Sequence, residues 1–333
     1  MRTVTVQGPE HLAVVDRPEP EPSPGQALVR VHSTGLCGTD LKILDGAIPV
    51  DLPRVLGHEV VGHVVAASGA DGTPTGSRVL VNPTSWCGRC AECLADAAHL
   101  CARGALMGRD VDGGMAELVA VDEQQLHPLP DEVDDRAASL LQVLGTCLHA
   151  QARVDVFPGQ TAVVLGLGVA GLLHLQLLRA RGVDRVIGVT RSPEKRRRAE
   201  ELGAWATAHP SEAEDLVRSR TGGRGADLVV ECAGVPATLR QAIELAAPRG
   251  RLLLFGIVGG AEDLPLYQLY FKELDVISAR AARARDYARA VDLAASGRLD
   301  LAPLWSDEFP LDQAEEAFGA VRQGSNLKVT LRI

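Results

Sequence analysis

The sequence lacks any apolar run that could span a bilayer, since such a helix needs about 20 consecutive apolar residues. Apolar residues make up 46% of the 333 but are dispersed along the chain. The first six residues alternate like a β-strand and contain no apolar signal core. A basic excess is also absent: the formal net charge of −9 argues against a nucleic-acid-binding surface. We therefore expect a cytoplasmic protein whose partners are small molecules, not nucleic acids or membranes.

Aromatic residues and lysines are scarce as well. Aromatics make up 3% of the chain, and lysine occurs only at Lys42, Lys195, Lys272 and Lys328. We interpret the preference for arginine as a reflection of genome composition. It nevertheless marks each lysine for inspection.

Cysteine, by contrast, is clustered. Of seven cysteines, four lie within fifteen residues as Cys87-x-x-Cys90-x-x-Cys93 and Cys101. Thiolates at this spacing can converge on one tetrahedral ion, and four of them close its shell. The cluster predicts a structural zinc site, which has no open position for catalysis. It also indicates a reducing compartment more than a disulfide framework.

The residue pattern of the chain changes along its length. Up to about residue 150 it contains short β-segments broken by Gly and Pro, such as Ala27–Val31, Val60–Ala67 and Arg78–Val81. A proline-rich stretch, 18–25, is predicted to be a turn or an edge connection. Long apolar-periodic segments begin with Ala137–Ala152.

From Thr161 onward, apolar strands alternate with helices, which predicts a doubly wound parallel sheet of α/β class. A further helix at Ala284–Ser296 and a strand at Lys328–Ile333 follow it. The expected strands are Thr161–Leu165, Arg185–Val189, Asp227–Glu231 and Arg251–Phe255, and the expected helices are Val169–Arg181 and Pro193–Leu202.

A glycine-rich loop, Gly166-Leu167-Gly168-Val169-Ala170-Gly171, connects the first of these strands to its helix. In this context the pattern predicts a dinucleotide site. Gly166 permits the tight turn, Gly168 lets the backbone approach a pyrophosphate, and Gly171 allows close helix–strand packing. The alternative is an ordinary glycine-rich turn.

The end of the second strand favours NADP over NAD. An NAD site usually has an acid there to bind the ribose hydroxyls. This chain instead has Thr190-Arg191-Ser192, with Arg196 close behind. A 2′-phosphate would meet a guanidinium and two hydroxyls. The alternative is that these arginines form a solvated helix face.

Two further motifs stand in the β-rich region, Cys37-Gly38-Thr39-Asp40 and Gly57-His58-Glu59, and Gly113-Gly114-Met115-Ala116-Glu117 follows them. With the cysteine cluster and the glycine-rich loop, they make the whole chain resemble the zinc-dependent medium-chain dehydrogenases. This family includes alcohol, sorbitol and related polyol or sugar dehydrogenases.

The resemblance implies two domains and an oligomer. Residues 1–150 and 281–333 would form a GroES-like catalytic domain with a structural zinc lobe at about 86–102, and residues 151–280 a Rossmann cofactor domain. Members of the family are homodimers or homotetramers. Two zinc ions per chain are expected, one structural and one catalytic.

The resemblance also assigns roles at the catalytic zinc. Cys37 and His58 would be ligands, and Glu59 matches a residue that ligates the metal in some members and lies behind the ligands in others. Asp40 matches the acid that orients the histidine. Thr39 matches the hydroxyl that contacts the substrate oxygen and passes on its proton.

Five positions depart from the family, compete for its metal site or extend that site. Gln142 stands where the third ligand is usually Cys or Glu, so we expect it to be a fourth ligand or to bond to the zinc water. We interpret Cys147 as a packing thiol, with the alternative that it is a rival ligand. Lys42 replaces a histidine of the proton relay, and it either joins the site or points to water. Lys328 matches a basic residue near the pyrophosphate. Met115 replaces a Phe, which favours a polar substrate.

The sequence therefore predicts a zinc-dependent oxidoreductase that transfers a hydride between NADP and a secondary alcohol, polyol or sugar-like substrate, or its ketone. One alternative is an NAD-linked dehydrogenase of a sugar, a cyclitol or a biosynthetic intermediate. Another is a catalytically silent relative that acts as a binding protein, an alternative that Gln142 and Lys42 keep open.

Overall fold

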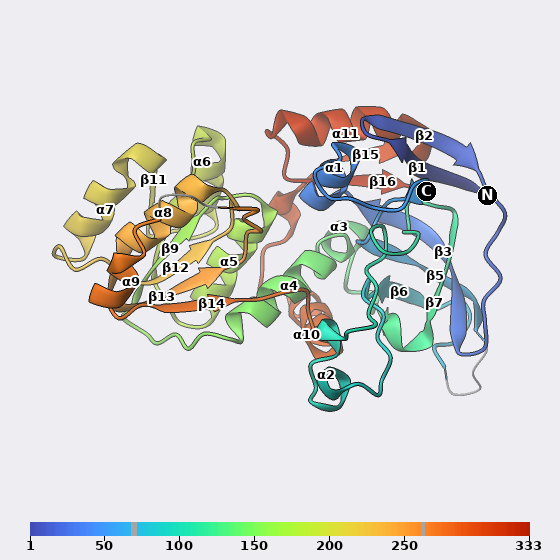
Figure 1. Cartoon of the computed structure of the whole chain (residues 1–333), viewed down its shortest axis with the longest axis horizontal. Helices are drawn as coiled ribbons and strands as arrows, with labels where there is room; N and C mark the ends of the chain where they lie inside the picture. The colour runs from blue at the N-terminus through green and yellow to red at the C-terminus, as the bar shows by residue number, and fades with distance from the viewer. Residues whose placement is uncertain (68–71, 261–263) are drawn as a thin grey trace. The chain divides into compact units, whose positions relative to one another are not determined.

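The computed structural model describes residues 1–67, 72–260 and 264–333 (Figure 1). The chain forms two compact units. The first unit comprises residues 1–145, 283–297 and 301–333, and the second comprises residues 146–282 and 298–300. Within the described ranges, no helix has the length and apolarity that crossing a membrane requires.

The first unit is built on β-sheets. Its larger sheet runs in the order β15-β16-β3-β5-β6-β8, with β7 also paired to β3. A smaller sheet has the order β2-β1-β4. The strands are β1 (Arg2–Gly8), β2 (His11–Asp16), β3 (Gln26–Gly35), β4 (Arg54–Val55), β5 (Val60–Ala67), β6 (Arg78–Val81), β7 (Leu118–Asp122), β8 (Leu126–Pro128), β15 (Trp305–Pro310) and β16 (Lys328–Arg332).

Alternation along the strands sets the core of this unit. On β3, Ala27, Val29 and Val31 are buried, while residues between them are more exposed. The valines of β5 and β6 pack against them in one apolar cluster. The proline-rich stretch 18–25 forms no strand, as predicted.

Short helices complete the first unit: α1 (Gly38–Leu44), α2 (Ala91–Leu94), α3 (Asp135–Ala138), α10 (Ala284–Ala295), α11 (Ala314–Gln323) and the start of α4 (Leu141–Gln151). The apolar segment expected at Ala137–Ala152 is interrupted, because α3 ends before Ser139, whose hydroxyl donates to the Arg136 carbonyl at 2.7 Å. Single 3₁₀ turns occupy Ala98–Leu100, Glu123–Gln125, Pro210–Glu212, Ala302–Leu304 and Leu311–Gln313.

The second unit confirms the predicted doubly wound sheet. Its strands run in the order β11-β10-β9-β12-β13-β14, and every pairing among them is parallel. Helices α5, α6 and α8 pack against the sheet (Figure 1). The elements are β9 (Thr161–Leu165), α5 (Val169–Ala180), β10 (Arg185–Val189), α6 (Pro193–Glu201), β11 (Ala206–Ala208), α7 (Ala213–Arg220), β12 (Ala226–Glu231), α8 (Pro236–Leu245), β13 (Ala246–Leu254), α9 (Tyr267–Phe271) and β14 (Asp275–Ser278).

The strand order reverses direction between β9 and β12. From β9, the chain proceeds to one side through β10 and β11, and then returns to the other side through β12, β13 and β14. Ligands of open parallel sheets bind beyond the carboxyl ends of the strands at such a switch point. Leu165 and Glu231 end the two adjacent strands there, in register.

Candidate functional site

The four clustered cysteines converge in the first unit. Sγ of Cys90 lies 3.4 Å from Sγ of Cys93 and 3.7 Å from that of Cys101, and Sγ of Cys87 lies 4.0 Å from that of Cys93. Four thiolates about 2.3 Å from a tetrahedral zinc would be separated by about 3.8 Å. The thiols are therefore arranged for one ion.

Nearby donors also favour the thiolate form of Cys87. Backbone N–H groups of Arg89 and Cys90 outweigh desolvation and lower the pKa of Cys87 to about 5. The Arg103 guanidinium donates to Cys87 Sγ at 3.2 Å. In the metal-free cluster a backbone hydrogen bond with Cys93 lowers the pKa of Cys90, but desolvation and hydrogen bonds with Glu92 and the neighbouring thiols outweigh it and raise this pKa to about 12. Thiolates are the species that bind zinc, and a bound ion would favour that form at all four positions.

Cys37 and Asp40 are held by the first turn of α1. Cys37 is the N-cap residue, and its N–H donates to the Asp40 carboxylate at 2.9 Å. Thr39 is half-buried in the same turn, with Oγ1 3.7 Å from Cys37 Sγ. Asp40 is fully buried, and its second oxygen lies 3.5 Å from Nδ1 of His58. The start of one short helix thus places a thiol and a carboxylate beside the imidazole, and a hydroxyl beside the thiol.

His58 and Glu59 precede β5 and are positioned by glycines. Gly57 has φ +99°, and a Cβ there would lie 2.7 Å from the Met115 nitrogen. The Met115 N–H donates to the Leu56 carbonyl at 2.8 Å, so the Gly-Gly-Met motif supports this segment from behind. A Cβ at Gly35 would lie 2.1 Å from Glu59 Oε2. Gly35 therefore makes room for the carboxylate.

Cys37, His58 and Glu59 form a second candidate metal centre. Each offers a ligand atom, and the three atoms lie within 4.8 Å of one another. One Glu59 oxygen, Oε1, is buried without a hydrogen-bond partner among the described residues. A thiolate, an imidazole and a carboxylate are donors that suit zinc, and three of them leave a position open. The donor set therefore fits the ion.

The electrostatics of His58 support the same conclusion. Burial lowers the pKa of His58, but the Asp40 carboxylate and a hydrogen bond with Cys37 outweigh it, so that the pKa stands well above 6.5. Surroundings that retain a proton on a buried imidazole are surroundings that stabilise a cation. A metal ion would replace that proton.

Lys328 is buried against this centre. Its ammonium pairs with Glu59 Oε2, and both side chains are at most 3% exposed. It also donates to the Leu36 carbonyl at 3.5 Å. Its expected role at the cofactor phosphates stays a prediction, whereas its contact with Glu59 is a feature that sequence reasoning missed. The sequence feature that could have indicated this contact is a lysine within an apolar strand, because a lysine is rarely buried unless it is paired with an acid.

Gln142 and Lys42, two of the departures from the family, lie in different surroundings. Gln142 is 8% exposed, in the first turn of α4. Lys42 is exposed, and its part in a proton relay stays a prediction. Cys147, the rival ligand, is fully buried, with Sγ 3.8 Å from the Ala170 carbonyl of α5. That contact agrees with the interpretation of Cys147 as a packing thiol.

The glycine-rich loop follows β9 at the switch point of the second unit. Gly166 has φ +91°, and a Cβ there would lie 3.0 Å from the Ala233 nitrogen beyond β12. Gly168 caps α5, and no atom lies within 4 Å of the Cβ it lacks. Gly171 packs so closely that its Cβ would lie 1.9 Å from the Gly166 carbonyl oxygen. Val169 and Ala170 form the first turn of α5, whose free N–H groups favour an anion.

The residues expected to determine the preference for NADP over NAD follow β10. Thr190 and Ser192 are half-buried, and Ser192 caps α6. Arg191 between them is exposed. Arg196 reaches back with Nη1 to the carbonyl of Thr190 at 3.0 Å, which stiffens the turn. Arg197 instead pairs with Glu201 on the helix surface.

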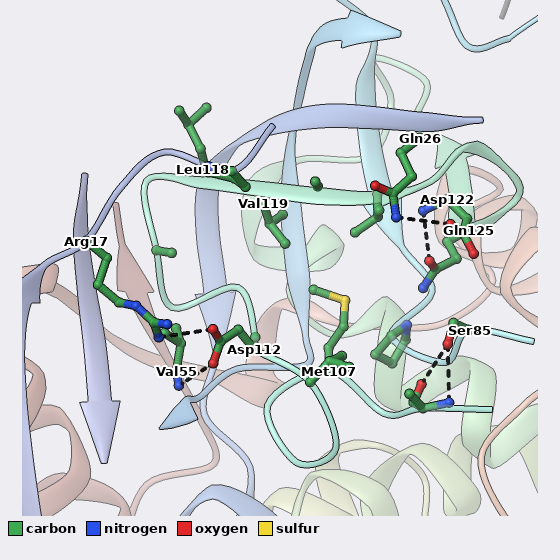
Figure 2. Close-up of a pocket in the computed structure, with 18 of the residues that line it drawn as sticks. Arg17, Gln26, Val55, Ser85, Met107, Asp112, Leu118, Val119, Asp122 and Gln125 are labelled. Carbon is green, nitrogen blue, oxygen red and sulfur yellow. Dashed lines mark hydrogen bonds and ion pairs between the residues drawn. The ribbon is translucent and has the colours of Figure 1, made fainter. Parts of the chain in front are cut away.

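A cavity of about 560 Å³ lies elsewhere in the first unit (Figure 2). Arg17 and Asp112 form an ion pair of 3.0 Å at one part of its wall, and Gln26 donates to Asp122 at another. Its lining, within the described residues, contains none of the candidate metal ligands.

Comparisons with known proteins agree with this geometry. Residues 23–131 match the alcohol dehydrogenase GroES-like domain, and residues 169–296 match the zinc-binding dehydrogenase family. The chain is 32% identical to a sorbitol dehydrogenase of Halalkalibacterium halodurans, over 98% of this chain and 97% of that protein. It is also 32% identical to a 2-dehydro-3-deoxy-L-galactonate 5-dehydrogenase of Pseudoalteromonas atlantica, over 93% and 92%.

A solved structure extends the likeness to the whole fold. A candidate zinc-binding dehydrogenase from Sinorhizobium meliloti 1021, bound to NADP, superposes with a TM-score of 0.91 at 34% identity. The match covers 100% of this chain and 99% of that one. With its GroES-like unit, its Rossmann-type sheet and its two convergent sets of metal donors, this chain belongs to the zinc-dependent medium-chain dehydrogenase family of oxidoreductases.

Proposed function

We propose that this protein transfers a hydride between NADP and a secondary alcohol, polyol or sugar-like substrate, or the corresponding ketone, at a zinc centre held by Cys37, His58 and Glu59. The observation that carries the proposal is the convergence of these three donors within 4.8 Å. It occurs in a chain that also carries a glycine-rich loop at the switch point of a parallel sheet.

The residues of the centre have complementary tasks. Zinc supplies Lewis-acid chemistry when bound, lowering the pKa of an alcohol, and the nicotinamide accepts the hydride. Thr39 Oγ1, 3.7 Å from Cys37 Sγ, is placed to take the substrate proton. Asp40 orients His58 through Nδ1. With zinc present, the charges of the ion and Lys328 balance those of Cys37, Asp40 and Glu59.

Metal analysis separates this enzyme from a silent relative. We expect two zinc ions per chain in the wild type and one in the Cys37→Ser variant, which retains the four-cysteine lobe. Cys232→Ser is the matched control, since this thiol belongs to the second unit. A wild-type chain with one zinc and no nicotinamide binding would favour a binding protein instead.

NADP preference is supported by the turn after β10, where Arg191 is exposed and no carboxylate occupies the turn. The NADP bound to the Sinorhizobium meliloti relative is consistent with it. The test is the ratio of kcat/KM for NADP to that for NAD. We expect Arg191→Ala to lower this ratio about tenfold or more, as the loss of a charge-assisted contact does. Arg197→Ala, on the helix surface, is the control, and a wild-type preference for NAD would refute the proposal.

A polar substrate is supported by the names of the relatives and by Met115, which stands where the family usually has Phe. Alcohols, polyols, sugars and cyclitols assayed with both cofactors would identify the class. Turnover of simple aliphatic alcohols alone would contradict the proposal.

We also propose a cytoplasmic homodimer or homotetramer. An apolar surface on the second unit supports self-association: Tyr267, Tyr270 and Phe271 of α9 are 65%, 80% and 77% exposed. β14 ends the sheet, so one side of this strand is unpaired within the described sheet. Light scattering should report a multiple of 35.2 kDa that Tyr270→Glu reduces. A monomeric wild type would refute the assembly without affecting the chemistry.

A further inference from the structure

Glu231 is a buried acid that the proposed hydride transfer does not use. It is the last residue of β12 and is 0% exposed. One oxygen of its carboxylate, Oε2, is buried without a hydrogen-bond partner among the described residues. A buried polar atom that lacks a partner costs free energy, so an acid at this position calls for a reason. The contacts of its other oxygen supply one.

That other oxygen, Oε1, holds the turn that follows β12. It accepts hydrogen bonds from the N–H groups of Ala233 and Gly234, both at 2.9 Å. It also accepts one at 2.7 Å from the hydroxyl of Thr238, which lies in the first turn of α8. A single carboxylate oxygen thus fixes the path of the chain from the end of the strand to the start of the helix.

The backbone of Glu231 holds the neighbouring turn, which follows β13. Its carbonyl accepts from the N–H groups of Phe255 and Gly256, both at 2.9 Å. A Cβ at Gly256 would lie 2.4 Å from the Gly234 nitrogen and 2.5 Å from Glu231 Oε2. The two turns therefore pack with no room for a side chain at Gly256. Glu231 links the carboxyl ends of two adjacent parallel strands.

The turn held by Glu231 also lies against the glycine-rich loop. A Cβ at Gly166 would lie 3.0 Å from the nitrogen of Ala233, the same N–H group that donates to Glu231. Dinucleotides bind across the switch point of the sheet, with one half on each side. The residues expected to meet the 2′-phosphate follow β10 on one side, so the nicotinamide half belongs on the other, over β12 and β13.

We propose that Glu231 is a positioning residue for the nicotinamide half of the cofactor: its Oε1 holds the turn 232–235 against Gly166, so that this part of the site is formed before the cofactor binds. The inference rests on the proposed function, which supplies the nicotinamide cofactor. A preformed site binds more tightly because no affinity is lost in ordering it. Arg191 acts at the 2′-phosphate, which only NADP has. Glu231 acts at the half that NADP and NAD share, so it sets affinity without setting the choice between them.

Dissociation constants for NADP and NAD, measured by fluorescence, test this role. Glu231→Leu removes the acceptor, and we expect it to weaken both cofactors about tenfold or more, by the same factor. Glu231→Gln keeps one acceptor oxygen for the three donors, so it should retain affinity to within about threefold of the wild type. Thr238→Val removes one donor and should weaken both cofactors about threefold, and it decides the question if Glu231→Leu does not fold. Arg191→Ala, by contrast, should change the ratio of the two constants.

Asp227 offers a matched control at the opposite end of the same strand. Its carboxylate also accepts a backbone N–H, that of Thr161 at 2.8 Å, but away from the switch point. Asp227→Ala should lower the melting temperature and leave both dissociation constants unchanged. Equal losses of affinity in Asp227→Ala and Thr238→Val, or unchanged affinity in Thr238→Val, would overturn the inference. A wild-type chain that binds neither cofactor would instead overturn the proposed function.

Discussion

Replacing Lys328 with methionine tests the electrostatics of the metal centre. Methionine keeps most of the side-chain volume and removes the ammonium that pairs with Glu59. Both side chains are at most 3% exposed, so the carboxylate would be left buried without its cation. Breaking a buried pair in this way costs about 3–5 kcal/mol of unfolding free energy. We expect that loss in the metal-free protein.

Zinc should reduce the cost, because the ion supplies a second counter-charge to Glu59. What remains is the loss of one hydrogen bond to a charged group, about 1.5–3 kcal/mol. The difference between the two states is about 2 kcal/mol. By linkage, the Lys328→Met variant should bind zinc about 30-fold more tightly than the wild type.

Urea unfolding with and without a chelator, together with chelator competition for zinc, measures both quantities. Arg197→Met is the control, because its pair with Glu201 is 60% and 52% exposed and is worth at most about 1 kcal/mol. The reasoning is wrong if Lys328→Met costs the same with and without zinc. It is equally wrong if the variant binds zinc more weakly than the wild type.

Three other predictions concern the loop, a buried histidine and the lobe. Gly168→Ala should change the free energy of unfolding by less than about 1 kcal/mol. It should nevertheless abolish NADP binding, measured by fluorescence, because the added methyl group fills only the space for the pyrophosphate. Gly171→Ala should lose stability as well as NADP binding, because its Cβ would lie 1.9 Å from a carbonyl oxygen. Burial lowers the pKa of His174 from 6.5 to about 3, so it contributes stability that is lost as pH falls through this window, by up to about 1.4 kcal/mol per pH unit. His174→Gln should flatten the pH dependence of urea unfolding, and an unchanged slope would refute the assignment. Cys101→Ser should leave one zinc per chain by elemental analysis and lower the melting temperature, whereas two retained ions would contradict a four-thiolate shell.

The second unit was predictable because its signals are local. Strands buried on both faces are continuous apolar runs, and β9 and β10 have the bounds that the sequence indicates. The helix after the glycine-rich loop ends at Ala180, one residue before the expected position. The cysteine cluster was predictable for the same reason, since its spacing alone brings the thiols together.

The metal centre could be only partly predicted. Cys37 and His58 were identified by family resemblance, not by any property of their local sequence. The pair between Lys328 and Glu59 joins residues 269 positions apart, which no local pattern records. Such contacts depend on tertiary structure, and they set the charge around the metal donors.

The discontinuity of the first unit has a consequence for how the chain is made. Its sheet needs β16, which pairs with β3 and brings Lys328 to Glu59, but residues 146–282 of the second unit are synthesised in between. During translation, the second unit can fold before β16 of the first unit has been synthesised. Until β16 pairs with β3, Glu59 has no ammonium partner. In chains that stall or are cut before residue 328, the Glu59 carboxylate would thus stay without the counter-charge that it has in the finished fold.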